Sequence, residues 1–498
     1  MPSLYEQVLG SLAGGEVPTP RPPRPSASVV LWRRAARGLQ VFWVERSTAL
    51  PFMGGWHSFP GGAVERTDAG TELRGAPQGL EDPAAVSPQP ESLAGETLAP
   101  DLVPGLAAAA LRELQEETGL ELADAARLVF AGRWLTPPLG PLRFDNRFFL
   151  LEWPASEPRQ PRIQSEEGGR PGELVAGEWL EPRAALERSG SGEVLAAPPV
   201  LHVLRVLAED GPEHGLVRLR DTSEANLGPF RAIEFRPGIL LFPLRTPTLP
   251  PATHTNCYLV GRGEAVLVDP GSPFPDEIAR LRAALEEAAS RLGRRAVAIW
   301  LTHHHSDHVG GVAALRAALG VPVLAHSATA ARLAEQGLEV DGELEDGGAR
   351  TLAGSSPLVL RVLHTPGHAR GHLCFHAPAE GALLCGDLVS GLGTVVIDPP
   401  EGDMEEYLAS LARARATGAR FLLPGHGPAI FAAAARLDAV REHRLEREKR
   451  VLAAWQAGLR DPAAMLAQVY EDTPDAARPL AERQIVAHLE RLRARGVL

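Results

Sequence analysis

The sequence T-H-H-H-S-D-H at residues 302–308 follows directly on the apolar run Val297–Leu301. An apolar run of this length predicts a buried strand, and the end of a strand projects side chains from a rigid base. The turn after the strand lets close neighbours converge on one point. Zinc prefers imidazole nitrogens and carboxylate oxygens at ~2.0–2.2 Å, and a cluster of this kind can serve two ions that share a water. The candidate ligands are His303, His305, Asp307 and His308.

Three more candidate ligands occur further along the chain in the same local context. The sequence H-T-P-G-H ends at His368, L-L-C-G-D ends at Asp387, and F-L-L-P-G-H-G contains His426. Each of these residues stands just past an apolar run and beside a glycine. One isolated histidine is usually a surface or core residue, but four such strand ends at one sheet edge predict a metal pocket.

The spacing H-x-H-x-D-H at 303–308 resembles the signature of the metallo-β-lactamase superfamily. The resemblance implies a zinc ion held by His303, His305 and His368, and a second held by Asp307, His308 and His426, with Asp387 bridging. It also implies that Asp307 orients the shared water and accepts its proton. The best-known true lactamases place a cysteine at the second metal, whereas Asp387 makes this chain similar to the glyoxalase II and RNase Z-like branches. Antibiotic hydrolysis is therefore not expected.

Two further histidines near this cluster are expected to have other roles. His304 fills a variable position of the signature and is expected to face away from the metals. His372, in H-A-R-G-H, resembles a histidine that recurs in relatives without being a ligand, and it is expected to support the structure.

Three other stretches resemble the beta-lactamase-like-protein-two group of this superfamily. They are G-D-L-V-S-G-L-G-T at 386–394, P-G-H-G-P at 424–428 and H-R-L-E-R-E-K-R at 443–450. Members of that group carry a C-terminal winged helix, which residues 455–498 are expected to form. The best-studied member type acts on single-stranded RNA, so the resemblance implies phosphodiester cleavage. The ligand set itself does not choose between attack on phosphorus and attack on a carbonyl.

The N-terminal half carries a second group of charged side chains, in R-E-L-Q-E-E-T-G-L at 112–120. A helix is predicted from about Gly105 to Thr118, ended by Gly119 at a C-cap position. Residues at i, i+3 and i+4 lie on one helical face, so three carboxylates are clustered there. Mg²⁺ or Mn²⁺, hard ions that bind carboxylates and substrate phosphate, would compensate these charges; the alternative is a solvated charged face. The three carboxylates are those of Glu113, Glu116 and Glu117.

This stretch matches the second half of the Nudix box, and F-P-G-G-A-V-E at 59–65 matches the lead-in to its first half. About 40 residues separate the halves, and Asp68 stands where a glutamate is usual. Three features resemble insertion-containing coenzyme A and nucleotide diphosphatases: the interruption itself, F-M-G-G-W-H-S-F-P-G-G at 52–62, and R-F-D-N-R-F-F-L at 143–150. The resemblance implies magnesium bound by Glu113, Glu116 and Glu117, catalysis through Glu116 and Glu117, a glutamate oriented by Arg112, and a further ligand from Glu65 or Asp68. The reaction implied is attack of water on a diphosphate linked to another group.

These observations predict an α/β protein of several domains. We expect a Nudix αβα sandwich at 26–215 with an inserted loop at 66–106, and a linker at 216–236. A metallo-β-lactamase αββα sandwich at 237–440 and a helical or winged-helix tail at 441–498 follow.

Composition limits the classes of function. At 498 residues the chain is too long for one ordinary core, and it offers no stretch of ~20 apolar residues for a membrane span. Three cysteines without C-x-x-C spacing favour a reducing cytoplasm. The formal charge of −12 argues against a protein that binds long nucleic acid over its whole surface.

Three interpretations remain open. The first is a bifunctional hydrolase that acts on a small phosphorylated substrate and on single-stranded RNA. The second keeps the zinc enzyme and makes the Nudix domain a ligand-sensing module. The third makes the zinc domain a thioester hydrolase in acyl-coenzyme A metabolism. The oligomeric state stays open.

Overall fold

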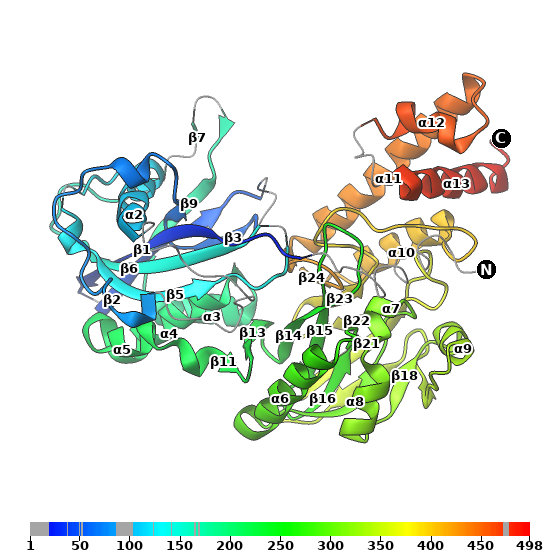
Figure 1. Cartoon of the computed structure of the whole chain (residues 1–498), viewed down its shortest axis with the longest axis horizontal. Coiled ribbons are helices and arrows are strands. Elements are labelled where there is room, and N and C mark those ends of the chain that lie inside the picture. The colour runs from blue at the N-terminus through cyan, green and yellow to red at the C-terminus, as the bar shows by residue number, and fades with distance from the viewer. Residues whose placement is uncertain are drawn as a thin grey trace. The chain divides into compact units, whose positions relative to one another are not determined.

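The computed structural model describes residues 19–36, 38–48, 50, 53–85, 103–122, 124–140, 142–163, 166–167, 170–471 and 478–498. The chain divides into two compact units, Pro20–Pro237 (the N-terminal unit) and Gly238–Leu498 (the C-terminal unit). Figure 1 shows both units, each a mixture of strands and helices. Among the described residues, no helix has the length and apolar character that a membrane span requires.

The N-terminal unit is built on a mixed sheet with the strand order β10-β3-β2-β1-β6-β5, to which β4 adds beside β1 and β9 beside β2. The central strand β1 runs antiparallel to β2 and parallel to β6. The strands are β1 (Arg24–Ala35), β2 (Gly38–Arg46), β3 (Trp56–Ser58), β4 (Gly61–Ala63), β5 (Val129–Leu135), β6 (Phe144–Glu152), β9 (Leu174–Leu180) and β10 (Leu195–Ala196), with a separate small hairpin of β7 (Glu166–Glu167) and β8 (Arg170–Pro171).

Helices cover both faces of this sheet because successive residues of β1 point to opposite sides. Val29 and Leu31 pack in one core with Leu114 of α2 (Val103–Thr118). Val30 packs in the opposite core with residues of α4 (Pro198–His214), beside α3 (Pro182–Ser191). The expected αβα layering is therefore observed, and the carboxylate-bearing helix ends at Thr118 as predicted.

Part of the predicted inserted loop is packed against the sheet. Gln78 exchanges backbone hydrogen bonds with Leu128 and Phe130 beside β5, and Ala85 is buried in the core under α2. Residues 66–85 contain no α-helix or named strand, and this part of the segment expected as an inserted loop is packed against the sheet and its core. Residues 86–102 lie outside the described residues.

The segment expected as a linker, 216–236, also differs from the prediction. It forms α5 (Leu216–Arg220) and the short strands β11 (Asn226–Leu227), β12 (Phe230–Arg231) and β13 (Ile233–Arg236). Leu219 lies in the core of the N-terminal unit. Because short apolar stretches here find a core to pack against, the segment is ordered rather than extended.

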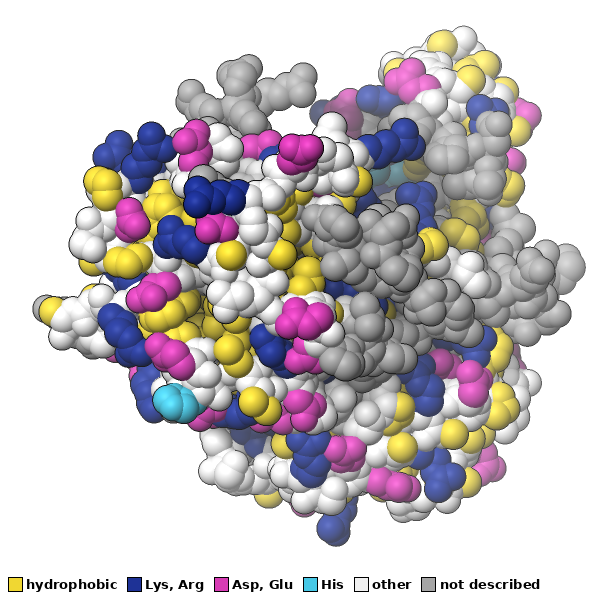
Figure 2. Space-filling model, turned by 60° about the vertical axis from the view of Figure 1, so that its left-hand side comes forward, with side chains coloured by type: hydrophobic (Ala, Val, Ile, Leu, Met, Phe, Trp, Pro, Cys, Tyr) yellow, Lys and Arg dark blue, Asp and Glu magenta, His cyan; other side chains and the backbone are white. Residues whose placement is uncertain are grey.

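On the face of the N-terminal unit that Figure 2 turns forward, basic and acidic side chains are interspersed over the coloured part of the surface. No continuous area of one charge sign is visible there among the described residues. The coloured part of this face is therefore of mixed charge.

The C-terminal unit contains two sheets packed face to face. Trp300 of the first sheet contacts Phe375 of the second, with ring centroids 5.1 Å apart. The first sheet includes β14 (Ile239–Arg245), β15 (His254–Gly261), β16 (Glu264–Val268), β17 (Arg295–Trp300), β18 (Val323–Ala325) and β19 (Gly342–Glu343), in that order. The second runs in the order β20 (Ala349–Leu352), β21 (Leu358–His364), β22 (Leu373–Ala377), β23 (Ala382–Gly386), β24 (Phe421–Pro424) and β25 (Ile430–Phe431).

Helices close both outer faces of this pair of sheets. The amphipathic helix α6 (Pro275–Leu292) lies with α8 (Val312–Leu319) against β17. On the other side, α10 (Met404–Ala416) packs its buried face against the second sheet. The layers are thus αββα, as the sequence predicted, and the three cysteines are all buried and free.

The tail consists, over its described residues 433–471 and 478–498, of helices alone. They are α11 (Ala433–Gln456), α12 (Pro462–Val469) and α13 (Arg478–Ala494), around a small core of their own. Figure 1 shows α11 running from the two-sheet body to α12 and α13. The domain boundary expected at 440 falls inside α11, because one continuous helix belongs to both parts.

Candidate metal centre

The seven predicted ligands come from four strand ends of the C-terminal unit, and the structure brings them together. His303 and His305 follow β17, and Asp307 and His308 lie in the short helix α7 (Ser306–Val309). The others follow β21, β23 and β24 and are His368, Asp387 and His426. All seven side chains are buried. They fall into three close groups, each compact enough to hold a metal ion.

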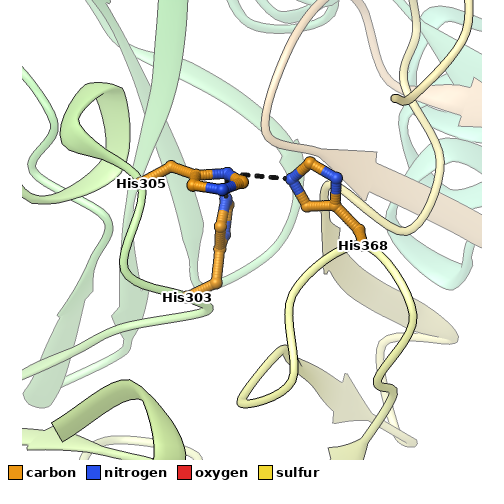
Figure 3. A group of neighbouring side chains, drawn as sticks. All are labelled: His303, His305 and His368. Carbon is orange, nitrogen blue, oxygen red and sulfur yellow. Dashed lines mark hydrogen bonds between the residues drawn. The ribbon is translucent and has the colours of Figure 1, made fainter. Parts of the chain in front are cut away.

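The first group contains three histidines, whose rings point toward one another in Figure 3. Nδ1 of His305 lies 2.9 Å from Nε2 of His303 and 3.0 Å from Nε2 of His368. Two of these residues come from the first sheet and one from the second. The site therefore forms only when the two sheets are packed together.

The second group contains Asp307, His308 and His426. Nε2 of His308 lies 3.3 Å from Nε2 of His426, which lies 3.4 Å from Oδ2 of Asp307. Asp387 stands between the groups. Its Oδ1 is 3.5 Å from Nε2 of both His308 and His426, and its Oδ2 is 3.7 Å from Nε2 of His368.

Hydrogen bonds on the outer side of the His368 and His426 rings determine which ring nitrogen carries the hydrogen and which one presents a lone pair to the centre. Nδ1 of His368 lies 2.7 Å from the Val396 carbonyl oxygen, and Nδ1 of His426 lies 3.0 Å from that of His254. Because a carbonyl oxygen only accepts, both Nδ1 atoms carry the hydrogen. The Nε2 lone pairs then converge on the centre, which is the arrangement that metal-binding histidines adopt.

Two carboxylates of the centre have oxygens without a hydrogen bond. Both carboxylate oxygens of Asp307 and Oδ1 of Asp387 are buried and lack such a partner among the described residues. An ionised carboxylate that is buried without compensation is strongly destabilising. Converging lone pairs and buried carboxylate oxygens without hydrogen bonds together fit cations, so the residues present suit two metal ions.

The histidine pKa values are consistent with a centre that attracts positive charge. Burial lowers the pKa of His303 and His305, assisted by the neighbouring histidines, so these rings stay neutral. Burial also acts to lower the pKa of His308, but the carboxylates of Asp387 and Asp269 outweigh it and raise that pKa well above its usual value. The carboxylates therefore draw either protons or a metal ion into this end of the centre.

Asp269 is a functional residue that the sequence analysis missed. Its Oδ1 accepts the Thr302 backbone N–H at 2.8 Å, and its Oδ2 accepts the Thr302 hydroxyl at 2.5 Å and Nδ1–H of His308 at 2.8 Å. The Thr302 hydroxyl in turn accepts from Nδ1 of His303 at 3.0 Å. One carboxylate thus orients a histidine in each metal group. The signal was present in D-P-G at 269–271, where an acidic residue directly follows a strand and stands two residues before a glycine.

A glycine is required at position 271, the last residue of this D-P-G sequence, for a steric reason. A Cβ atom at this position would lie 1.8 Å from the backbone oxygen of Asp307. The close approach of the two loops therefore excludes a side chain.

His372 and His304 lie close to the centre but belong to none of the three groups. Nε2 of His372 accepts the backbone N–H of Asp387 at 3.1 Å, while its Nδ1 is paired with the Thr365 hydroxyl at 2.8 Å. Burial lowers the pKa of His372 to about 3, so it is neutral and positions Asp387. His304 packs against the ring of His305, with centroids 4.8 Å apart.

In the N-terminal unit, Arg112 contacts several of the predicted carboxylates at once. Its guanidinium binds both oxygens of the buried Asp68 at 3.1 Å. It also donates to Glu113 at 2.8 Å and to Glu116 at 3.0 Å, while Glu117 accepts the Gly61 backbone N–H at 2.8 Å. The acidic residue that Arg112 orients bidentately is therefore Asp68, whose two oxygens are both engaged.

The two partly buried carboxylates of this cluster, those of Glu113 and Glu117, resist ionisation. Burial raises the pKa of Glu117 to about 8, although the Gly61 N–H opposes the change, and burial also raises the pKa of Glu113. Among the described residues, no close group of metal-ligating atoms includes these carboxylates. The structure thus places the predicted residues on one helical face, without drawing them into a preformed ligand set.

Comparison with protein families matches the Metallo-beta-lactamase superfamily over residues 250–426 and the Beta-lactamase associated winged helix domain over residues 462–497. Both matches confirm what the sequence motifs predicted for these segments.

Among curated proteins, the chain is 30% identical over 251 residues to the Beta-lactamase-like protein 2 homolog of Caenorhabditis elegans, covering 49% of this chain and 80% of that protein. It is 34% identical over 201 residues to the Atrochrysone carboxyl ACP thioesterase of Aspergillus chevalieri, covering 40% of this chain and 60% of that protein.

Among solved structures, a metallo-beta-lactamase family protein from Thermus thermophilus is 28% identical with a TM-score of 0.41, over 52% of this chain and 94% of its own. A NUDIX hydrolase from Alicyclobacillus acidocaldarius is 26% identical with a TM-score of 0.31, over 40% of this chain and 95% of its own. The relatives, the family match and the winged-helix match lead to one conclusion: the chain belongs to the metallo-beta-lactamase superfamily and is a hydrolase of that superfamily.

Proposed function

We propose that the C-terminal unit is a two-zinc hydrolase. The observation that carries the proposal is the convergence of imidazole lone pairs beside buried carboxylate oxygens that lack hydrogen bonds. We assign one zinc to His303, His305 and His368 and the other to Asp307, His308 and His426, with Asp387 between them.

Two zinc ions, when bound by these residues, would lower the pKa of water and so supply hydroxide near neutral pH. Asp307 is the residue that orients this water and accepts its proton. Asp269 and the Val396 carbonyl keep the ligand rings in the tautomers that binding requires. His372 holds the Asp387 backbone in place.

For the substrate, we propose an acyl thioester, attacked at its carbonyl carbon. A relative with 34% identity is named a thioesterase, and the N-terminal sequence resembles coenzyme A diphosphatases. The two halves would then act on related metabolites.

Single-stranded RNA is the second candidate, and the winged-helix match supports it. The charges of the tail weigh against it, because several of its cations are already paired. Arg491 contacts Glu448 and Glu405, and Arg450 lies 3.5 Å from Glu471. RNA affinity depends on cations that can neutralise phosphates, and paired side chains supply less of it.

The test is a substrate panel on the zinc-loaded full chain. We would compare acyl-coenzyme A thioesters with labelled single-stranded RNA, using the parent, Asp307→Ala and the control Asp438→Ala. Asp438 is a half-exposed aspartate of the same unit, paired with Arg415. Thioester cleavage by the parent and the control but not by Asp307→Ala is the expected result.

Cleavage of RNA alone would replace the thioester assignment with phosphodiester hydrolysis. Two bound zinc ions without cleavage of either substrate would contradict both substrate assignments. A parent protein that binds no zinc would contradict the metal centre itself.

We also propose that the N-terminal unit is a Nudix-type diphosphatase that uses Mg²⁺ or Mn²⁺ at Glu113, Glu116 and Glu117. The raised pKa values of Glu113 and Glu117 support a cation, because a cation would stabilise their charged forms. A ligand-sensing module without chemistry is the alternative. The interrupted motif and the Asp68 substitution favour that alternative.

These two interpretations are separated in an Asp307→Ala background, where the zinc centre contributes no hydrolysis. Diphosphatase activity on coenzyme A or ADP-ribose that is lost in Glu116→Gln/Glu117→Gln, but kept in the exposed control Glu121→Gln, supports catalysis. Activity that is unchanged in the double variant would show that the N-terminal unit does no chemistry.

The three free, buried cysteines support a reducing compartment such as the cytoplasm.

A further inference from the structure

The segment 394–400 lies between the metal centre and the winged-helix tail. It belongs to the stretch 387–403, which forms neither helix nor strand. Its Val396 carbonyl accepts the Nδ1 hydrogen of His368 at 2.7 Å. Within the group His303, His305 and His368, the second sheet contributes only His368. The position of the Val396 carbonyl therefore affects how the His368 ring is oriented toward the other two histidines.

Side chains of the tail hold this segment from the opposite side. Arg444 of α11, which is 1% exposed, donates to the Thr394 hydroxyl at 2.7 Å and to the Val395 carbonyl. Gln484 of α13 donates to the same Val395 carbonyl at 3.0 Å and accepts from Arg444 at 3.1 Å.

A third side chain acts a few residues further along. Arg483 of α13 contacts Asp398, which is buried, and the Pro399 carbonyl. Val396 itself packs against Leu480 of α13 and against Leu249. Polar and apolar contacts from the tail therefore restrain the whole segment.

These contacts matter because the segment has no sheet or helix ladder of its own. The buried carbonyl groups of such a segment must find hydrogen-bond donors on other elements. Donors from the tail hold the Val395 carbonyl, and Leu480 and Leu249 hold the Val396 side chain, so the residue whose carbonyl accepts from His368 is restrained both at its preceding peptide and at its side chain. Without Arg444 and Gln484, the Val396 carbonyl would be free to turn away from His368. The ring would then lose the partner that keeps its Nε2 lone pair on the metal side.

We infer that the winged-helix tail positions the metal ligand His368, with Arg444, Gln484 and Arg483 acting on it through segment 394–400. The inference rests on the proposed metal centre. It makes the tail a structural part of that centre, whatever substrate the centre takes. Arg444 and Gln484 are positioning residues, because they reach the metal only through Val395, Val396 and His368.

The experiment measures zinc affinity of the full chain by competition with a chromophoric chelator, for the parent, Arg444→Met and Gln484→Leu. The matched control is Arg447→Met, one turn further along α11. Arg447 is also buried, and it donates to the Val469 carbonyl and stacks on Tyr470, both inside the tail. Circular dichroism and thermal unfolding of the metal-free proteins establish that each variant is folded.

Loss of a residue that orients a metal ligand typically weakens metal binding 10–100-fold. We expect about a 10-fold or larger rise in the Kd of the zinc ion assigned to His303, His305 and His368 for Arg444→Met and Gln484→Leu, against a change within about twofold for Arg447→Met. Cobalt substitution gives a second readout, a changed visible spectrum in Arg444→Met but not in Arg447→Met. Partial recovery in Arg444→Lys, which retains one donor, would add support.

Parental zinc affinity in Arg444→Met overturns the inference. Equal weakening by Arg444→Met and Arg447→Met also overturns it, because the tail would then act only through general stability. Failure of the proposed hydrolase appears separately, as a parent protein that binds zinc but cleaves no substrate, and the affinity pattern would still decide the inference.

Discussion

Replacing Asp269 by Asn removes one acceptor from a carboxylate that serves three donors. These donors are the backbone N–H and the hydroxyl of Thr302 and Nδ1–H of His308. Asp269 has a φ of +49°, and asparagine tolerates this left-handed region as well as aspartate does. The substitution therefore changes the hydrogen-bonding pattern without adding backbone strain.

The expected loss of zinc affinity follows from the groups that the new amide of Asp269→Asn would face. If the amide oxygen keeps the Thr302 N–H, the amide NH₂ points at the Thr302 hydroxyl and at Nδ1 of His308. The favoured tautomer of His308 then accepts the amide hydrogen at Nδ1 and carries its own hydrogen on Nε2. The nitrogen that faces the metal would no longer present a lone pair. A hydrogen bond to a charged group contributes about 1.5–3 kcal/mol, and 1.4 kcal/mol corresponds to a tenfold change in an equilibrium constant. We expect zinc affinity to fall about 10–100-fold, a range typical for partners of metal ligands.

The assay is chelator competition on the full chain, with metal-free circular dichroism as the check on folding. Thr302→Ser, which keeps the hydroxyl, is the matched control and is expected to bind zinc within about twofold of the parent. A folded Asp269→Asn protein that binds both zinc ions with parental affinity would refute the role assigned to this carboxylate.

Three other perturbations give independent tests. In Gly425→Ala the new Cβ would lie 2.6 Å from Oδ1 of Asp387. Overpacking of this kind costs about 1–3 kcal/mol, and isothermal titration should show weaker zinc binding than in the control Gly342→Ala, whose new Cβ would make only ordinary contacts with Leu324. Burial, with help from Arg188, lowers the pKa of His57 from 6.5 to about 4, so the unfolded chain binds more protons between these values. Stability should therefore fall by up to about 3 kcal/mol as pH drops from 6.5 to 4, and a thermal melt of His57→Gln that keeps the full parental loss would contradict this. Asp68→Asn weakens the bidentate contact with Arg112 and should destabilise the N-terminal unit by about 1–3 kcal/mol, seen as faster hydrogen exchange in α2; unchanged exchange would argue against it.

Regular elements with a strong local pattern were predictable from the sequence. The helix Pro275–Leu292 carries such a pattern, because its apolar residues recur at helical spacing and Gly293 takes the left-handed C-cap conformation. The helix that carries Glu113 was predicted for the same reasons, with Gly119 at a φ of +69°. Segments without periodicity were interpreted less well. Residues 66–85 and 216–236 are packed, because isolated apolar side chains such as Ala85 and Leu219 find cores formed by distant parts of the chain.

The sequence by itself determined the identity of the seven metal-site candidates and the class of the protein. Each candidate lies directly after an apolar strand, and a strand end imposes its geometry locally, so chain order alone indicated where the ligands would meet. Only the tertiary structure decided how those ligands are held. Asp269 acts across 33 residues of sequence on Thr302, and Arg444 acts across 49 on Val395. Such contacts leave no periodic signal, because hydrogen bonds between distant loops depend on how the two sheets and the tail pack, and no local spacing encodes that packing.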